Sequence, residues 1–499
     1  VETVTGATAQ AEVLQLLNAG SLTISDIDTV IGSTGADTLT LGTTGTLVVS
    51  GIESVIGTSD TTDVVQLLTS GAITVSGVDT VVGTSGVNDV VTLGTTGALA
   101  VDRIDTVIGS TDSTDALTLL SGGLVRVSDI ESVIGDTTLT EVVQMLAAGT
   151  VGVSDIATVL GSTGTDQISL LAEGTLAVSG VESVLGSTDT GDVLTLLGGG
   201  SVIVEDVDSI IGQAGQTETL TLAGTAASIS VSAIDSVVGS TDTSESVTLL
   251  ASGNISLQDV ENLTGTGQTT DVARLIGNGA TLTVSDVASV IGSTGTDVVT
   301  MATGTLAVAN VDTVIGSSGA DVLTLNSAGA VAVSDVESIV GQAGLTEVVT
   351  LEGSDAVVAE SGVDTIIGTS GTGDHLTMGA SGRLAVSAIE SVTGSGSAQD
   401  VLSLLDNGAT ISVDTLASVV GSTGTDVLTM AAGTLAVSGI ETVVGSAGTD
   451  VLTLNAAGAV EVSDVETVIG QAGLVETITL AGASGVVSVS AINSVIGSS

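Results

Sequence analysis

One short motif returns from end to end of the chain and limits what it can fold into. In this motif an aliphatic residue, an acidic residue, Thr or Ser, an aliphatic residue and one variable residue precede a glycine, as in Ile440 to Gly445. Twenty such anchor glycines, from Gly6 to Gly497, give a mean period of about 26 residues. A period of this size is typical of solenoids, propellers and repeat arrays, because each unit buries its apolar face only against its neighbours.

Each repeat contains three short apolar sets separated by turn residues. In the repeat after Gly445 they are Asp450 to Leu454, Ala459 to Val462 and Val465 to Ile469. Apolar and polar residues alternate in these sets, and a period of two indicates a β-strand. We therefore predict an all-β fold, a parallel β-solenoid (β-helix) of about 19 coils of about 26 residues, with three short strands per coil.

The whole chain, residues 1–499, is predicted to be one continuous repeat domain, because no linker or shift of composition interrupts it. It has no Phe, Tyr, Trp, Pro or Cys, so Val, Ile, Leu and Ala must fill a thin core. Neither end carries a polar capping coil, since Val1 to Gly6 and Ile492 to Gly497 are ordinary third strands. We expect a segment of a longer chain, or molecules that join end to end or laterally.

A longer period lies over the short one. The block Val290 to Gly304 nearly repeats as Val419 to Gly433, an offset of 129 residues. Five repeats were therefore duplicated as a unit. Ala157, Ala288 and Ala417 mark its phase, because Ala there replaces the acid that usually follows the first aliphatic residue of the third strand.

The formal charge of −53 makes cations the natural partners. Nucleic acid and anionic lipid require a basic surface, so neither is an expected partner. No apolar run approaches the eighteen or so residues that cross a bilayer, and we predict no membrane insertion.

An acid stands at the start of the first strand in every complete repeat. These predicted metal ligands are Glu12, Asp37, Asp63, Asp89, Asp115, Glu141, Asp166, Asp192, Glu218, Glu245, Asp271, Asp297, Asp321, Glu347, Asp374, Asp400, Asp426, Asp450 and Glu476. In a coil of one repeat they would stack in one column about 4.8 Å apart. Neighbouring charges would then repel by roughly 1 to 3.5 kcal/mol, which Ca²⁺ bound between them would relieve. The alternative is that each acid caps its turn by accepting backbone N–H bonds.

The turn from Gly32 to Asp37, followed by Leu39, resembles the glycine-rich nonapeptide of the RTX (repeats-in-toxin) proteins. Turns beginning at Gly161, Gly292, Gly316, Gly421 and Gly445 share its spacing. They depart from that family in having Ser or Thr for the second glycine and one motif per 26 residues, and the other thirteen turns carry an extra residue. The resemblance covers the turns alone. It implies Ca²⁺ as cofactor and a bacterial protein that is secreted or at the cell surface.

Two further polar sets face outward in this scheme. The second residue of the third strand is usually an acid, as at Glu441 and Glu466, and is interpreted as a solvated face or a weak cation-binding surface. Thr on the first strand, as at Thr429 and Thr453, predicts an outward ladder, and flat Thr arrays raise ice binding as one alternative function.

Catalysis requires one place that differs from the rest, and the repeats are too uniform to suggest one. We therefore predict that the chain is not an enzyme but a structural, Ca²⁺-stabilised extracellular rod of a bacterial surface layer, filament or adhesin stalk. A polysaccharide-binding or polysaccharide-degrading β-helix is the other alternative, with cell-surface polysaccharide as its partner.

Overall fold

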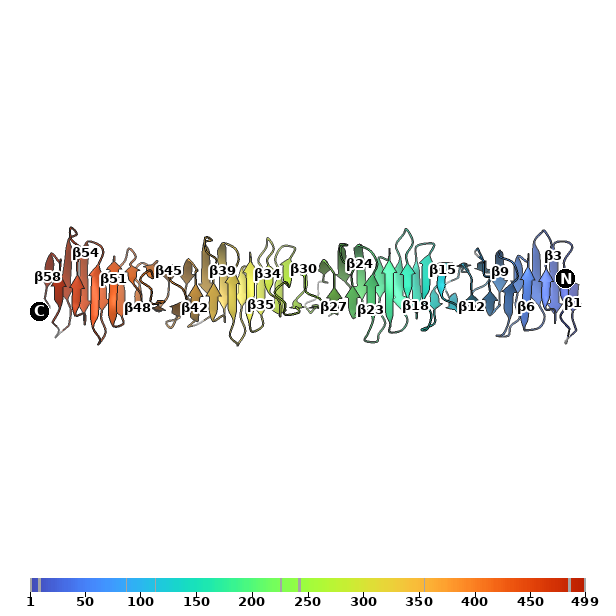
Figure 1. Cartoon of the computed structure of the whole chain (residues 1–499), viewed down its shortest axis with the longest axis horizontal. Coiled ribbons are helices and arrows are strands. Elements are labelled where there is room, and N and C mark those ends of the chain that lie inside the picture. Colours follow the sequence, from blue (N-terminus) through green and yellow to red (C-terminus); the bar gives the residue numbers. More distant parts are fainter. Residues whose placement is uncertain are drawn as a thin grey trace. The chain divides into compact units, whose positions relative to one another are not determined.

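The computed structural model describes residues 2–7, 10–86, 88–112, 114–224, 227–240, 244–353, 355–482 and 486–497. Strands, numbered to β58, run through these residues, and no helix occurs among them (Figure 1). The chain divides into two compact units, Val1–Ala251 and Ser252–Ser499. The first contains β1 (Glu2–Thr5) to β29 (Ser246–Leu249), and the second contains β30 (Asn254–Gln258) to β58 (Ser494–Ile496). Val1, predicted to begin the first strand, lies outside the described residues.

Strands pair in parallel with the strand two places along the chain. The pattern is clear in seven consecutive strands of the second unit, namely β47 (Val401–Leu404), β48 (Thr410–Asp414), β49 (Ser418–Val420), β50 (Val427–Met430), β51 (Gly433–Ser438), β52 (Thr442–Val444) and β53 (Asp450–Leu454). In one sheet β47 pairs with β49, β49 with β51 and β51 with β53; in the other β48 pairs with β50 and β50 with β52. Within each unit, odd-numbered strands form one sheet and even-numbered strands the other. The predicted parallel β-solenoid is confirmed.

The predicted coil of three strands is wrong in one respect, because each turn of the solenoid contains two strands. Every connection reverses the chain direction and carries it to the opposite sheet. A repeat has three strands, an odd number, so it covers one and a half turns, and the next repeat begins on the other sheet. The first strands β47, β50 and β53 show this, since β50 lies in the sheet opposite to the other two.

The inward residues of the two sheets form the thin core. Leu452 pairs with Leu435 on one side and with Val468 on the other, and all three side chains are buried. Val465 and Val468, the first and fourth residues of the third apolar set, are buried as predicted, while Ile469 is partly exposed. Small aliphatic side chains suffice because each layer has to fill only the space between two strands.

The anchor glycines are required by a close contact between successive turns. The residue at the bend between the second and third strands commonly has positive φ, as in Asp464 (φ 55). Its carbonyl oxygen points at the anchor glycine of the turn before: a Cβ on Gly445 would lie 1.9 Å from the carbonyl oxygen of Asp464. It would also lie 2.9 Å from Oδ2 of Asp450. Since most of this contact is backbone, no side-chain adjustment can relieve it.

We expect Gly421→Ala to destabilise its surroundings by about 3 kcal/mol, because the new Cβ would lie 2.0 Å from the carbonyl oxygen of Gly439. Gly382→Ala is the matched control. A Cβ at Gly382 meets nothing within 4 Å, so its effect should stay within about 0.5 kcal/mol. Hydrogen exchange of the flanking strands measures both changes, and equal protection in the two variants would contradict the role given to the anchor.

Candidate functional site

The acids that begin the first strands lie inside the solenoid. All of them are fully buried except Glu12, which is half-buried. Each stands where the turn after an anchor glycine enters the first strand, so its carboxyl group points back into that turn. An unpaired carboxylate in such a place would be strongly destabilising, so the partners of these groups decide what they do.

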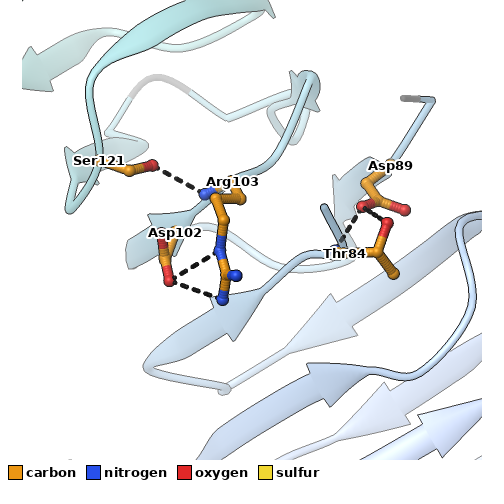
Figure 2. Close-up of polar contacts among 5 residues, drawn as sticks. All are labelled: Thr84, Asp89, Asp102, Arg103 and Ser121. Carbon is orange, nitrogen blue, oxygen red and sulfur yellow. Dashed lines mark hydrogen bonds and ion pairs between the residues drawn. The ribbon is translucent and has the colours of Figure 1, made fainter. Parts of the chain in front are cut away.

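Most aspartates in this position use their carboxylates to join two turns; Asp63 is an exception, because its Oδ1 is buried with no hydrogen-bond partner among the described residues. Oδ2 of Asp450 accepts the N–H of Ser446 in its own turn at 2.6 Å, and Oδ1 accepts the N–H of Gly433 in the turn before at 3.2 Å. Figure 2 shows the same capping at Asp89, whose Oδ2 accepts the N–H and the hydroxyl of Thr84 at 2.7 and 2.8 Å. The capping alternative from the sequence is therefore what the structure contains, in turns of either length.

The expectation of a single column of carboxylates is wrong. Asp450 stacks on Gly433, not on another acid, and the same is true of Glu347 on Gly329. Because a repeat covers one and a half turns, consecutive acids lie on opposite edges of the solenoid. Two acids on one edge are three turns apart, or about 14 Å. At this distance a Ca²⁺ ion cannot bridge neighbouring members of the set.

The second set of acids, expected to be a solvated face or a weak cation-binding surface, also has a specific structural role. Oε2 of Glu466 accepts the backbone N–H of Asp450 from the turn before at 2.8 Å. Glu441 does the same for Asp426 at 2.9 Å, and Asp312 does so for Asp297 at 2.9 Å. An aspartate such as Asp450 is thus held between two turns, through its carboxylate on one side and its amide on the other.

The alanines that mark the longer period interrupt this arrangement. Ala288 and Ala417 occupy the place of the second acid and offer no acceptor. The amides of Asp271 and Asp400 donate instead to the carbonyl oxygens of Gln268 and Ser397, each at 3.2 Å. The repeat therefore folds without the second acid because the preceding turn supplies another acceptor.

Five glutamates of the first set leave one carboxyl oxygen without a hydrogen-bond partner among the described residues. Oε1 of Glu347 accepts the N–H of Gln342 at 3.0 Å, whereas the N–H of Gly329 donates to the backbone carbonyl of Thr346 at 3.0 Å. Oε2 of Glu347 is then buried with no hydrogen-bond partner among the described residues. The same holds for Oε2 of Glu12, Glu141, Glu218 and Glu476.

Two of the buried acids have shifted pKa values. Burial raises the pKa of Glu218, and the nearby Asp235 carboxylate adds to the rise, although the N–H of Gln213 opposes it. Burial alone would also raise the pKa of Asp271, but the hydroxyl and N–H of Thr266 and the N–H of Gly253 outweigh it and lower that pKa. In these two groups the balance between burial and hydrogen-bond donors thus sets the direction of the pKa shift.

The residues predicted to bind Ca²⁺ are not brought together. Within the described ranges, no group of three or more His, Cys, Asp or Glu side chains is placed to hold a metal ion. The Asp carboxylates already accept N–H and hydroxyl donors, so a bridging ion does not fit the first set. Binding at single carboxylates stays a prediction.

The outward Thr ladder expected on the first strands is continuous in some places and interrupted in others. Thr453 stacks between Ala436 of β51 and Ile469 of β55 (Thr467–Ile469). Elsewhere a Thr of the second strand continues the ladder, since Thr23 stacks on Thr40 and Thr283 stacks on Thr300. Ice binding, which would require a flat and continuous Thr array, stays a prediction.

One acid that the sequence analysis missed lies in the core. Glu360 is the fourth residue of β42 (Val357–Ser361), which is an inward position. In β45 (Arg383–Ser387), the equivalent strand of the next repeat, Val386 occupies this position. It is 3% exposed and stacks between Ile339 and Met378. A charged residue at an inward position of the alternating pattern was the signal that could have revealed it.

The surroundings of Glu360 favour its neutral form. Among the described residues, the N–H of Val363 donates to its carboxyl group, 3.4 Å from Oε2. Burial raises the pKa of Glu360 to about 7; the N–H of Val363 lowers it, and the charge of Asp400 raises it further. The core around β42 therefore contains a carboxyl group that titrates near neutral pH.

Stability around β42 should fall as the pH rises from 4.5 to 7. In this interval the folded state keeps the Glu360 proton that the unfolded chain, with a pKa of 4.5, has released. The loss amounts to about 3 kcal/mol and is complete above pH 7. We expect Glu360→Val to remove this loss. The free energy of unfolding of the variant, relative to that of the unchanged chain, should therefore be about 3 kcal/mol larger at pH 8 than at pH 4.

Hydrogen exchange of β42 and its neighbours, corrected for intrinsic rates, measures this pH dependence. Glu360→Gln is the control, because it keeps a polar side chain in the core without a titrating proton. A stability difference between Glu360→Val and the unchanged chain that is constant with pH would contradict the assignment.

The fold and its buried polar groups together define a class of protein: a parallel β-solenoid repeat protein whose buried acids are hydrogen-bonded at the turns. Neither a protein-family model, nor a curated protein, nor a solved structure matches the chain. No helix of a length and apolarity that would cross a membrane is found in the part of the chain that the structure describes.

Proposed function

We propose that this chain is a structural protein, an extracellular segment of a bacterial surface layer, filament or adhesin stalk. The observation that carries the proposal is the repeated use of the buried acids. Asp37, Asp166 and Asp450, far apart in the sequence, each join the turn after an anchor glycine to the turn before it. Buried carboxylates with these hydrogen bonds hold successive turns together, and the outer surface stays available for contacts.

The same observation argues against an enzyme as the alternative. Catalytic groups must converge on one place, with a nucleophile or base within reach of a partner that orients it. The buried acids of the first set instead recur once per repeat, at the start of each first strand. His375, the single histidine, donates to or accepts from the Ser391 hydroxyl at 2.9 Å on a strand surface.

Calcium enters the proposal through the exposed carboxylates. A chain with a formal charge of −53 and four Arg repels itself, and divalent cations lower that repulsion. The second acids, such as Glu337, Glu441 and Glu466, reach the surface while accepting one N–H each, and their remaining lone pairs are available to a hydrated Ca²⁺. The proposed extracellular location is consistent with this assignment, because Ca²⁺ is millimolar outside the cell.

A calcium titration tests this part of the proposal. At fixed ionic strength we expect millimolar Ca²⁺ to raise the melting temperature by at least about 5 °C, and Mg²⁺ to raise it less. Particle size, followed in the same samples, reports whether copies associate laterally or end to end.

Substitution by the corresponding amides distinguishes the contributions of the two sets of acids to the Ca²⁺ response. Glu337→Gln, Glu441→Gln and Glu466→Gln together keep an acceptor for each N–H but remove three surface charges, and should weaken the Ca²⁺ response. Asp321→Asn, Asp426→Asn and Asp450→Asn form the matched buried set and should leave the response intact. No response to Ca²⁺, or an equal response to Mg²⁺, would end the calcium assignment.

A further inference from the structure

Exposed aliphatic side chains gather on the outer face of one sheet in the first unit. The strands that carry them are neighbours in this sheet (Figure 1), namely β17 (Glu141–Met145), β19 (Thr158–Leu160), β21 (Thr175–Ser179), β23 (Val193–Leu196) and β25 (Ser209–Ile211). Leu146, directly after β17, is 47% exposed, Leu197, directly after β23, is 42% exposed, and Ile211 is 39% exposed. Leu160 is partly exposed on the same face.

The register of the strands places these side chains in one stripe. Ile211 pairs with Thr195, the outward residue before Leu197, so the two aliphatic side chains are diagonal neighbours. Leu160 stands in the same relation to Leu146. Diagonal neighbours on adjacent strands lie about 7–8 Å apart, within reach of long side chains. We call these four residues the aliphatic stripe.

No charged residue lies on the outer face of these five strands. Its other residues are Val142, Gln144, Thr158, Thr175, Ala177, Ser179, Val193, Thr195 and Ser209. The chain has 57 acids, and near this face they stand in the turns and bends, as the exposed Asp155, Glu173 and Asp189 do. The stripe is therefore the centre of a neutral face with acidic edges.

The equivalent strands five repeats later do not have such a stripe. They are β32 (Val272–Leu275), β34 (Ser289–Ile291), β36 (Thr305–Ala309), β38 (Val322–Leu325) and β40 (Ser338–Val340). Asn326 stands there in place of Leu197, and the cationic Arg274 stands in place of Gln144. No large aliphatic side chain on the described outer face of these strands is as exposed as those of the stripe. The stripe is thus a property of one region and not a consequence of the repeat.

A second copy of the chain is the occupant that this face fits. Two sheet faces stack about 10 Å apart, as in a β-sandwich. Five strands at 4.8 Å, each about 17 Å long, cover roughly 400 Å² per copy and so about 800 Å² in total, the size of weak, reversible contacts. Two chains with a charge of −53 can meet here without bringing carboxylates together, whereas a charged partner finds no charge to recognise.

We propose that the aliphatic stripe is a lateral contact between copies of this chain, in which the same face of the first unit is used by both. Such a contact is isologous, and a neutral aliphatic face is complementary to itself. Burial of Leu146, Leu197 and Ile211 drives the association, while the acids stay in water at the edges. The inference rests on the proposed structural role, because it names the surface through which copies of a surface layer or filament touch.

Removal of the stripe tests the proposal. In the full-length chain, Leu146→Ser, Leu160→Ser and Ile211→Ser are combined. The matched control combines the substitutions at the equivalent positions five repeats later, which are Ile276→Ser, Ile291→Ser and Val340→Ser. Association is measured by sedimentation equilibrium in the presence of EDTA, so that Ca²⁺ does not contribute. Circular dichroism and melting temperature confirm that each variant is folded.

We expect the unchanged chain to associate reversibly with a Kd of about 10–500 µM. The stripe variant should associate at least about tenfold more weakly, and the control should stay within about twofold. Raising NaCl from about 0.05 to about 0.5 M should strengthen the association, because salt screens the acidic edges. A chain that stays monomeric, equal effects of the two variants, or weakening by salt would each overturn the inference. The structural role is tested separately by the Ca²⁺ response.

Chemical cross-linking reports which faces meet. The chain has no Cys, so a single one can be placed in the middle strand of the face by Ala177→Cys. Ala307→Cys is the control at the equivalent position of β36, and both alanines are partly exposed. A bis-maleimide that spans about 10 Å, the spacing of stacked sheets, should give at least about fivefold more covalent dimer with Ala177→Cys. Equal yields from the two variants would overturn the proposed face.

Discussion

A chain lacking residues 292–315 should fold as the intact chain does. This deletion removes one repeat and joins Ile291 to Gly316, so that the turn from Gly316 to Asp321 replaces the turn from Gly292 to Asp297. The strands downstream move to the opposite sheets, but each still stacks on a strand of the kind it stacks on now. We expect the β-sheet circular dichroism and the melting temperature to be almost unchanged.

A chain lacking residues 292–309 should not fold correctly at this point. This deletion removes one physical turn, from the end of β34 (Ser289–Ile291) to the end of β36 (Thr305–Ala309), and leaves all downstream strands on their present sheets. Third strands would then follow each other, and the N–H of Ala280 would lose Oδ1 of Asp297, its acceptor at 2.9 Å. A buried unpaired N–H costs about 1–3 kcal/mol, in addition to the mismatched strands.

Limited proteolysis distinguishes the two deletions, because a mismatched junction exposes the backbone on both sides of it. We expect rapid cleavage near the junction in the chain without 292–309 and none in the chain without 292–315. The opposite result would mean that the physical turn, not the repeat of one and a half turns, is the unit of folding.

The substitution Leu452→Asp should destabilise the core around β53 by about 4 kcal/mol or more. Leu452 is fully buried between Leu435 and Val468, so an aspartate there would have no partner for its charge. Thr453→Asp is the matched control at the next position, where the side chain lies on the outer face of the sheet. It should change stability by about 0.5 kcal/mol at most.

Hydrogen exchange of β51, β53 and β55 measures the local cost of these two substitutions. Protection should be lost in all three strands of the Leu452→Asp variant and retained in the Thr453→Asp variant. Comparable losses would show that the two faces of β53 are assigned wrongly.

The sequence was sufficient to predict the strands and their facing. The alternation in Asp450 to Leu454 indicated which residues point inward, and the repeat length indicated stacking in parallel. The number of strands in each turn of the solenoid could not be predicted from the sequence in the same way. Three apolar sets per repeat are consistent with a coil of three strands and equally with one and a half coils of two, because turn residues do not reveal the angle by which they redirect the chain.

The chemistry of the acids depended on that angle. Once successive repeats begin on opposite sheets, Asp426 and Asp450 lie on different edges, and the column on which bridging calcium relied is not formed. Their capping contacts were foreseeable from local turn chemistry, because Ser422 and Ser446 are near in sequence. The contacts to Ala409 and Gly433, seventeen residues away along the chain, required the stacking to be known.

Because each repeat covers one and a half turns, it also determines on which edges of the solenoid equivalent surface groups lie. Within the second unit, the bend at Ala288 carries the chain from an odd-numbered to an even-numbered strand, whereas the bend at Ala417 carries it from an even-numbered to an odd-numbered strand. Surface groups that recur once per repeat therefore alternate between opposite edges of one unit. If such groups bind a partner, the unit presents sites on two edges, and a partner that reaches both gains from its high local concentration after the first contact.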